Sequence, residues 1–211
     1  MNLDGLSDAL QSRFDAKMAA RESALTASRR SIRSSANAIR AIHRGEFDAA
    51  RELMDRSRQA LEEARGATAG HPDLFFAGYV QDAQKEYAEA RLTEAVVRGE
   101  DLPTPEDLGV EDAPYLNGIA EAIGEVRRSI LDLLRQGEVG RGEELLGVMD
   151  DLYSLLVTID YPDAITGNLR RSTDVARSIM ERTRGDLSLA LIQEGLRDAL
   201  EHHARDLHGE T

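Results

Sequence analysis

The sequence has 211 residues and a formal net charge of −13, with no cysteine, no tryptophan and few aromatic residues. The lack of cysteine excludes disulfide bridges and thiolate metal sites and indicates a reducing compartment, which we take to be the cytoplasm. No apolar run approaches the roughly 18 residues that a membrane span needs, so we expect no membrane-inserted part and a single compact domain over residues 1–211.

The residue types predict an all-α protein. Alanine, leucine, arginine and glutamate dominate, which is typical of long helices rather than of sheets. Of the 26 basic residues only Lys17 and Lys85 are lysines. An acidic surface poor in lysine is typical of proteins from a high-salt cytoplasm, although ordinary acidic proteins also have such a surface. High salt would screen the repulsion between this surface and a polyanion. Net charge therefore does not exclude a nucleic-acid ligand.

Glycine and proline residues divide the chain into segments that predict a bundle of seven helices. A break is expected near Met18 in the first segment, and a short turn over residues 104–107. The predicted helices cover about residues 3–44, 46–67, 75–97, 113–136, 139–159, 169–182 and 186–207.

The predicted helix at residues 75–97 carries a carboxylate where an apolar side chain is expected. On a helical wheel Glu86 falls within the stripe of Tyr79, Ala83 and Ala90, and Glu89 lies at the edge of this stripe. A buried unpaired carboxylate costs several kcal/mol or stays protonated, so a partner is required. Two interpretations stay open: an ion pair with one of the many arginines, or a hard divalent cation bound by clustered carboxylates.

The helix predicted at residues 113–136 carries a second pair of acids. Glu121 and Glu125 lie one turn apart on its polar side, as ordinary surface carboxylates do. They could also complete a cation site if the two helices cross antiparallel at that level. Histidines occur in no metal-binding pattern such as HExxH, and no GxSxG, Walker or GxGxxG motif is present.

Four arginines share one stripe of the first predicted helix: Arg29, Arg33, Arg40 and Arg44. The stripe is interpreted either as a solvated face or as a ridge that follows phosphates. No aromatic side chains alternate with these arginines, so base stacking is not supported there.

Several segments resemble the translin family. Residues 83–90 (AQKEYAEA) resemble its QEYxEA helix, and residues 115–128 (YLNGIAEAIGEVRR) are similar to its LGLADLTGELMR segment. The C-terminal part of the family is matched by YP at 161–162, LRR at 169–171, DVAR at 174–177 and ERTRGDL at 181–187. The resemblance covers residues 20–195 in order.

The resemblance implies a seven-helix protomer of translin type that assembles into a closed, hollow homo-octamer with single-stranded RNA or DNA inside. Translin-associated factor X is the catalytic branch, a metal-dependent endoribonuclease, whereas translin mainly binds nucleic acid. Carried over by motif, Glu86, Glu89, Glu121 and Glu125 would be the catalytic acids and the ligands of one or two Mg²⁺ or Mn²⁺ ions. The third acid is usually aspartate, and Glu121 is one methylene longer.

The expected function is therefore cleavage of single-stranded RNA, with water activated and the phosphodiester polarised by the metal. Two other classes stay open: a non-catalytic oligomer that binds single-stranded nucleic acid, and a helical scaffold in which Glu86 pairs with arginine. The arginines expected to hold the strand are Arg29, Arg33, Arg40, Arg44, Arg127, Arg128, Arg170 and Arg171.

Overall fold

Helices account for the secondary structure of the computed structural model, which describes residues 3–209, with side chains from residue 3 to residue 206. Within this range there are nine helices and no strand, which confirms the predicted all-α class. The long helices are α1 (Leu3–His43), α2 (Phe47–Thr68), α4 (Tyr79–Arg98), α6 (Asp112–Gln136), α7 (Val139–Thr158) and α9 (Leu169–Gly209). The three short helices, one turn each, are α3 (Pro72–Phe75), α5 (Pro105–Leu108) and α8 (Asp163–Thr166).

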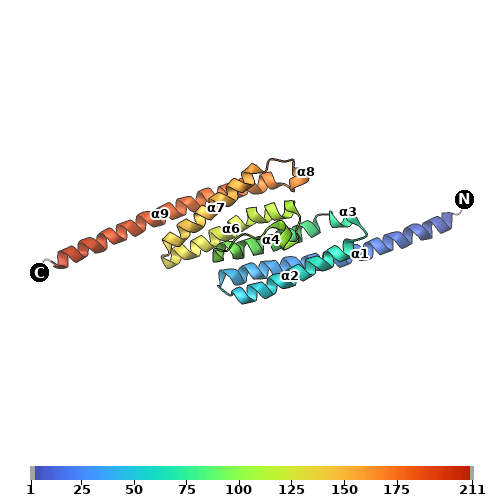
Figure 1. The fold of residues 1–211 in the computed structure, drawn as a ribbon, viewed down its shortest axis with the longest axis horizontal. Helices are drawn as coiled ribbons and strands as arrows, with labels where there is room; N and C mark the ends of the chain where they lie inside the picture. The colour runs from blue at the N-terminus through green and yellow to red at the C-terminus, as the bar shows by residue number, and fades with distance from the viewer. Residues whose placement is uncertain (1–2, 210–211) are drawn as a thin grey trace.

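The long helices lie side by side in pairs (Figure 1). One outer pair is α1 and α2, the central pair is α4 and α6, and the other outer pair is α7 and α9. The first half of α1 and the second half of α9 extend beyond the bundle at opposite ends (Figure 1). The two central helices therefore have neighbours on several sides.

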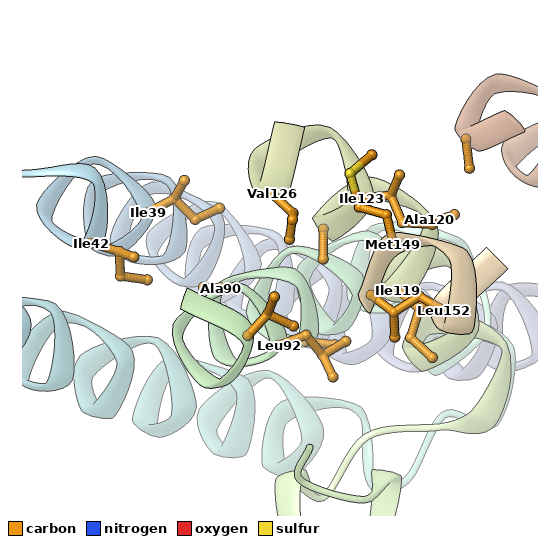
Figure 2. Close-up of a cluster of buried hydrophobic side chains, with 14 of the residues drawn as sticks. Ile39, Ile42, Ala90, Leu92, Ile119, Ala120, Ile123, Val126, Met149 and Leu152 are labelled. Carbon is orange, nitrogen blue, oxygen red and sulfur yellow. The ribbon is translucent and has the colours of Figure 1, made fainter. Parts of the chain in front are cut away.

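The core lies between the central pair and its neighbours. Figure 2 shows Ile119 and Ile123 of α6 near Leu92 of α4 and near Met149 of α7. All four are fully buried, and each such side chain contributes about 1.5–3 kcal/mol relative to exposure. This packing fixes α4 against α6. No described helix is long and apolar enough to span a membrane.

Three boundaries differ from the prediction. The helix expected at residues 75–97 is split at Gly78, which has a φ of +98°. The Gln81 side chain stabilises this break, because it accepts a hydrogen bond from the Gly78 N–H and donates one to the Phe75 carbonyl. Helix α1 runs through Met18 without a break. The predicted sixth and seventh helices form one helix, α9, which continues through Gly185.

The continuity of α9 has a tertiary cause. Thr183 and Leu187, on either side of Gly185, are buried against the bundle. Arg127 of α6 donates to Thr183 Oγ1 (3.0 Å) and pairs with Asp186 (2.8 Å). Contacts across this turn offset the roughly 1 kcal/mol that a glycine costs inside a helix.

Candidate metal centre

The candidate site lies at a close contact between α4 and α6, at Gly118. A Cβ added to Gly118 would lie 2.9 Å from Ala88 Cβ, 3.0 Å from the Lys85 carbonyl oxygen and 3.1 Å from the Glu89 nitrogen. Two of these atoms belong to the α4 backbone, so only a glycine allows the helices to pack this closely. The contact brings the carboxylates of one helix within reach of those of the other.

Three of the four predicted acids converge at this crossing. One oxygen each from Glu86 and Glu89 of α4 and from Glu121 of α6 lie within 4.8 Å of one another. Three carboxylate oxygens form a donor set that suits a hard divalent cation such as Mg²⁺ or Mn²⁺. The structure therefore brings together three of the four residues that the sequence analysis assigned to a metal.

Glu89 is the most enclosed of these acids. It is 8% exposed, and no side chain that the structure describes forms a hydrogen bond or ion pair with its carboxyl. Burial, followed by the charges of Glu121, Glu86 and Glu125, raises the pKa of Glu89 to about 8. An unpartnered carboxyl at this depth is costly, and a bound cation would compensate it.

Glu86 is half-buried, and burial is also the main cause that raises its pKa. No arginine lies within ion-pair distance of Glu86 among the described residues, so the arginine partner proposed from the sequence is not found. The nearest cation is Lys85, whose Nζ lies 3.7 Å from Glu86 Oε1 and donates to Glu121 Oε1 at 2.6 Å. The sequence analysis did not assign Lys85 to the site, although its position directly before Glu86 could have indicated that it lies beside the carboxylates.

Glu125 lies outside the group of three. His43 Nε2 of α1 donates to Glu125 Oε2 at 2.5 Å, and this hydrogen bond is the main cause that lowers the pKa of Glu125. The other ring nitrogen of His43 lies 3.4 Å from Ser129 Oγ of α6. The sequence analysis missed His43, because 82 residues separate it from Glu125 and no spacing pattern joins them.

Replacing His43 with asparagine should lower the free energy of unfolding by about 1–3 kcal/mol near neutral pH, because Glu125 loses a hydrogen bond. The lowered pKa of Glu125 means that this contribution is present above its unfolded pKa and is lost as pH falls through its folded pKa. Denaturant unfolding of the wild type and the variant across pH measures the difference, with exposed His203→Asn as control. A difference that stays constant into acid would show that Glu125 ionisation is not involved.

The predicted arginines fall into two groups. Arg171 lines a cavity of about 340 Å³ together with Glu89 and Glu121, and Arg128 lies 3.9 Å from Glu125. Arg127 is engaged between α6 and α9, and Arg170 pairs with Asp160 at 3.1 Å. Only Arg171 borders a cavity together with acids of the converging group, whereas Arg128 lies beside Glu125.

The arginine stripe of α1 is exposed, which fits both interpretations of it. Arg44 lies just after α1 and forms two hydrogen bonds with Glu46, whereas Arg40 donates to Asn37. Arg29 and Arg33 form no ion pair among the described residues. On the helical wheel His43 lies about 40° from Arg29, so the stripe runs beside the face of α1 that reaches Glu125.

A second, larger cavity adjoins the first. It has about 770 Å³ and is bordered by Asp82, Lys85, Asn117, Glu121 and Ser172, of which Glu121 and Ser172 also line the smaller cavity. Buried Asn117 fixes this wall, because it donates to the Thr166 carbonyl (2.8 Å) and accepts from Ser172 Oγ (2.8 Å). Glu89 and Glu121 thus border the smaller cavity, and Glu121 also borders the larger one together with Asp82 and Lys85.

The fold and the site define a class: a helical protein with a carboxylate cluster between its two central helices. No family model matches the sequence. The chain is 31% identical over 187 residues to the uncharacterized protein MJ0175 of Methanocaldococcus jannaschii, covering 87% of this chain and 82% of that protein.

Solved structures share the fold. The crystal structure of AfC3PO from Archaeoglobus fulgidus has a TM-score of 0.81 and 33% identity, covering 88% of this chain and 97% of that chain. AfC3PO has also been solved in complex with duplex RNA (TM-score 0.81, 32% identity, 88% of this chain and 96% of that chain). Apo-NeC3PO from Nematostella shares the fold at 21% identity, with a TM-score of 0.76 over 90% of this chain and 97% of that one.

The chain belongs to the translin family, to which these C3PO proteins belong. The family resemblance found in the sequence is thereby confirmed.

Proposed function

We propose that the protein is a divalent-metal-dependent endoribonuclease that cleaves RNA inside a homo-oligomer. The observation that carries the proposal is the convergence of Glu86, Glu89 and Glu121 at the Gly118 crossing, with an unpartnered buried carboxyl among them. The similarity to AfC3PO, which has been solved with duplex RNA, supports RNA as the ligand.

The three carboxylates would hold Mg²⁺ or Mn²⁺, with Glu125 one helical turn away from Glu121 on α6 as a further ligand if His43 releases it. When bound, the metal supplies Lewis-acid polarisation of a phosphate oxygen and activation of water. The remaining chemistry belongs to the chain. Burial limits water around Glu89, whereas Glu86 and Glu121 stay partly exposed. Arg171 borders the same cavity as Glu89 and Glu121, where it can pair with a phosphate.

The exposed arginines support a binding track for the strand. Arg29, Arg33 and Arg40 follow α1 towards the end where His43 meets Glu125, and Arg128 continues the track on α6. Phosphate contacts of this kind carry no sequence information, so we expect weak sequence preference and strong salt dependence. Arg127 and Arg170 contribute to the fold or pair with acids instead.

Two apolar stripes support assembly. Exposed Leu10, Phe14 and Met18 follow one face of the N-terminal half of α1, and exposed Ile192 and Leu196 follow one face of the C-terminal half of α9. These segments extend beyond the bundle (Figure 1), and apolar stripes of this length mark contact surfaces between proteins. We propose a homo-oligomer, with an octamer as the specific expectation; the mass in solution measures it, and a stable monomer would contradict it.

A non-catalytic RNA-binding oligomer is the second candidate, and one observation favours it. Glu125 is held by His43, and Lys85 pairs with Glu121 and Glu86, so three of the four acids are already engaged by side chains of the chain. In this alternative the carboxylates are structural and RNA binds without being cleaved.

The test is incubation of end-labelled RNA with the protein in Mg²⁺, in Mn²⁺ and in EDTA, with single-stranded and duplex RNA in parallel. We expect internal cleavage that requires the metal and is lost in Glu86→Ala. RNA binding without cleavage under every condition would support the second candidate. Cleavage that persists in EDTA and in Glu86→Ala would place the activity elsewhere.

A further inference from the structure

The carboxylate cluster already contains a cation that belongs to the chain. Lys85 Nζ lies 2.6 Å from Glu121 Oε1 and 3.7 Å from Glu86 Oε1, and its side chain is 24% exposed. It therefore bridges two of the three carboxylates whose oxygens converge, from α4 to α6. A divalent cation bound by the same oxygens would compete with the ammonium for them.

The choice of lysine at this position is unusual for the chain. Only Lys17 and Lys85 are lysines among 26 basic residues. A lysine ammonium is a compact point charge on a flexible stem, whereas the arginine guanidinium is planar and forms bidentate pairs with carboxylates. An ammonium can therefore leave a carboxylate cluster more easily than a guanidinium can.

The structure offers the ammonium a second position. Asp82 lies on α4 one turn before Lys85, and both residues border the cavity of about 770 Å³. The charge of Asp82 acts on the Lys85 ammonium, and Asp82 forms no ion pair among the described residues. Residues three apart on a helix are neighbours, so Lys85 can reach Asp82 by a change of side-chain rotamer alone.

We propose that Lys85 is an internal counter-ion of the metal centre, which holds Glu86 and Glu121 together without metal and is displaced to the Asp82 side when a divalent cation binds. The inference rests on the proposed function, because it requires the carboxylates to bind a metal. If Lys85 acts in this way, a divalent cation must displace its ammonium in order to bind. The apparent affinity for the metal is then lower than the carboxylates alone would give.

The test is Mn²⁺ binding to the assembled protein, measured by calorimetry, with no RNA present. We expect Lys85→Gln to bind Mn²⁺ about tenfold more tightly than the wild type, because the loss of a competing charge in a half-buried site is worth roughly one order of magnitude. Lys85→Arg should bind more weakly than the wild type, because its bidentate pair is harder to displace. The control is Lys17→Gln, which changes a partly exposed lysine of α1 that pairs with Asp73 and not with the cluster.

If the ion pairs of Lys85 serve only the stability of the fold, the variants should show a different order of Mn²⁺ affinities. In that case Lys85→Gln would bind Mn²⁺ equally or less tightly than the wild type, and this result overturns the inference while leaving the metal centre in place. If the wild type and every variant fail to bind Mn²⁺, both the inference and the proposed metal-dependent function are wrong. Should Lys85→Gln not fold without metal, Lys85→Arg decides alone, and unchanged or tighter binding by that variant overturns the inference.

A second readout separates competition from a general change of the site. In EDTA, Lys85→Gln should unfold at a lower temperature than the wild type, because Glu86 and Glu121 lose the ammonium that pairs with both of them. Saturating Mn²⁺ should raise its unfolding temperature by more than that of the wild type, because ligand stabilisation grows with affinity. Asp82→Asn should weaken Mn²⁺ binding about twofold to fivefold, since the displaced ammonium loses its second partner.

Discussion

Replacing Glu89 with glutamine is expected to make the metal-free protein more stable while removing most of its metal binding and RNA cleavage. Glutamine has the shape of a protonated glutamate, and the Glu89 carboxyl is buried without a hydrogen-bond partner among the described side chains. Its pKa is raised to about 8, first by burial and then by the charges of Glu121 and Glu86. If Glu89→Gln raises the stability of the metal-free protein, then Glu89 does not serve the fold, and we infer that it serves metal binding.

The sign of the pH dependence follows from this raised pKa. Below its unfolded pKa, Glu89 is protonated in both states and contributes no penalty. As pH rises towards the folded pKa of about 8, the unfolded state releases the proton and the folded state retains it, so the free energy of unfolding decreases. In EDTA near neutral pH the variant should therefore be more stable than the wild type by roughly 2–4 kcal/mol, and the difference should vanish below about pH 4.

Metal should reverse this order. Mn²⁺ should stabilise the wild type and have little effect on Glu89→Gln, and cleavage should fall by about two to three orders of magnitude, as is typical when a transition-state electrostatic contact is lost. Chemical denaturation across pH, with and without Mn²⁺, measures the stabilities. The control is Glu94→Gln, also buried on α4 but paired with Arg51 at 3.3 Å, which should be destabilising and leave Mn²⁺ binding intact. A Glu89→Gln variant less stable than the wild type at every pH would refute the assignment.

The sequence predicted the class of the fold and three of the acids that converge in the candidate metal centre, but it misjudged which acid is the most buried. The helical wheel assumed that one face of the helix meets the core, and it placed Glu86 in the apolar stripe. Helix α4 instead contacts α1, α2 and α6, so most of its circumference is enclosed. Under these conditions Glu89, at the edge of the predicted stripe, becomes the deeper residue.

The partners of the acids were beyond sequence patterns for a similar reason. His43 reaches Glu125 only because α1 packs beside the central pair, and Lys85 reaches Glu121 only because α6 lies against α4. Gly185 was expected to end a helix, yet contacts from Arg127 hold the turn on both sides of it. Local signals predicted where helices begin and which residues carry charge, and tertiary packing determined which charges meet.

Replacing Gly118 with alanine is expected to disrupt both the stability of the bundle and the metal centre. The added methyl group would lie 3.0 Å from the Lys85 carbonyl oxygen and 3.1 Å from the Glu89 nitrogen, and neither backbone atom can move by changing a rotamer. The helices α4 and α6 must therefore separate, and this overpacking costs about 1–3 kcal/mol. The higher helix propensity of alanine returns at most about 1 kcal/mol. We expect a net loss of about 1–2 kcal/mol in the free energy of unfolding.

The same separation acts on the carboxylates, because Glu86 and Glu89 lie on one side of the contact and Glu121 on the other. A cation bound by all three depends on the distance between the helices, so Mn²⁺ affinity should fall by about tenfold or more. Gly124→Ala on the same helix is the matched control: its added Cβ would contact only Ile179 Cδ1, at 3.8 Å, among the described atoms, so this variant should gain stability and keep its Mn²⁺ affinity. If Gly118→Ala loses stability but binds Mn²⁺ as the wild type does, the metal is held by one helix alone and the site between the helices is wrong. If both properties fall together, the close approach at Gly118 is what joins the acids of α4 and α6 into one centre.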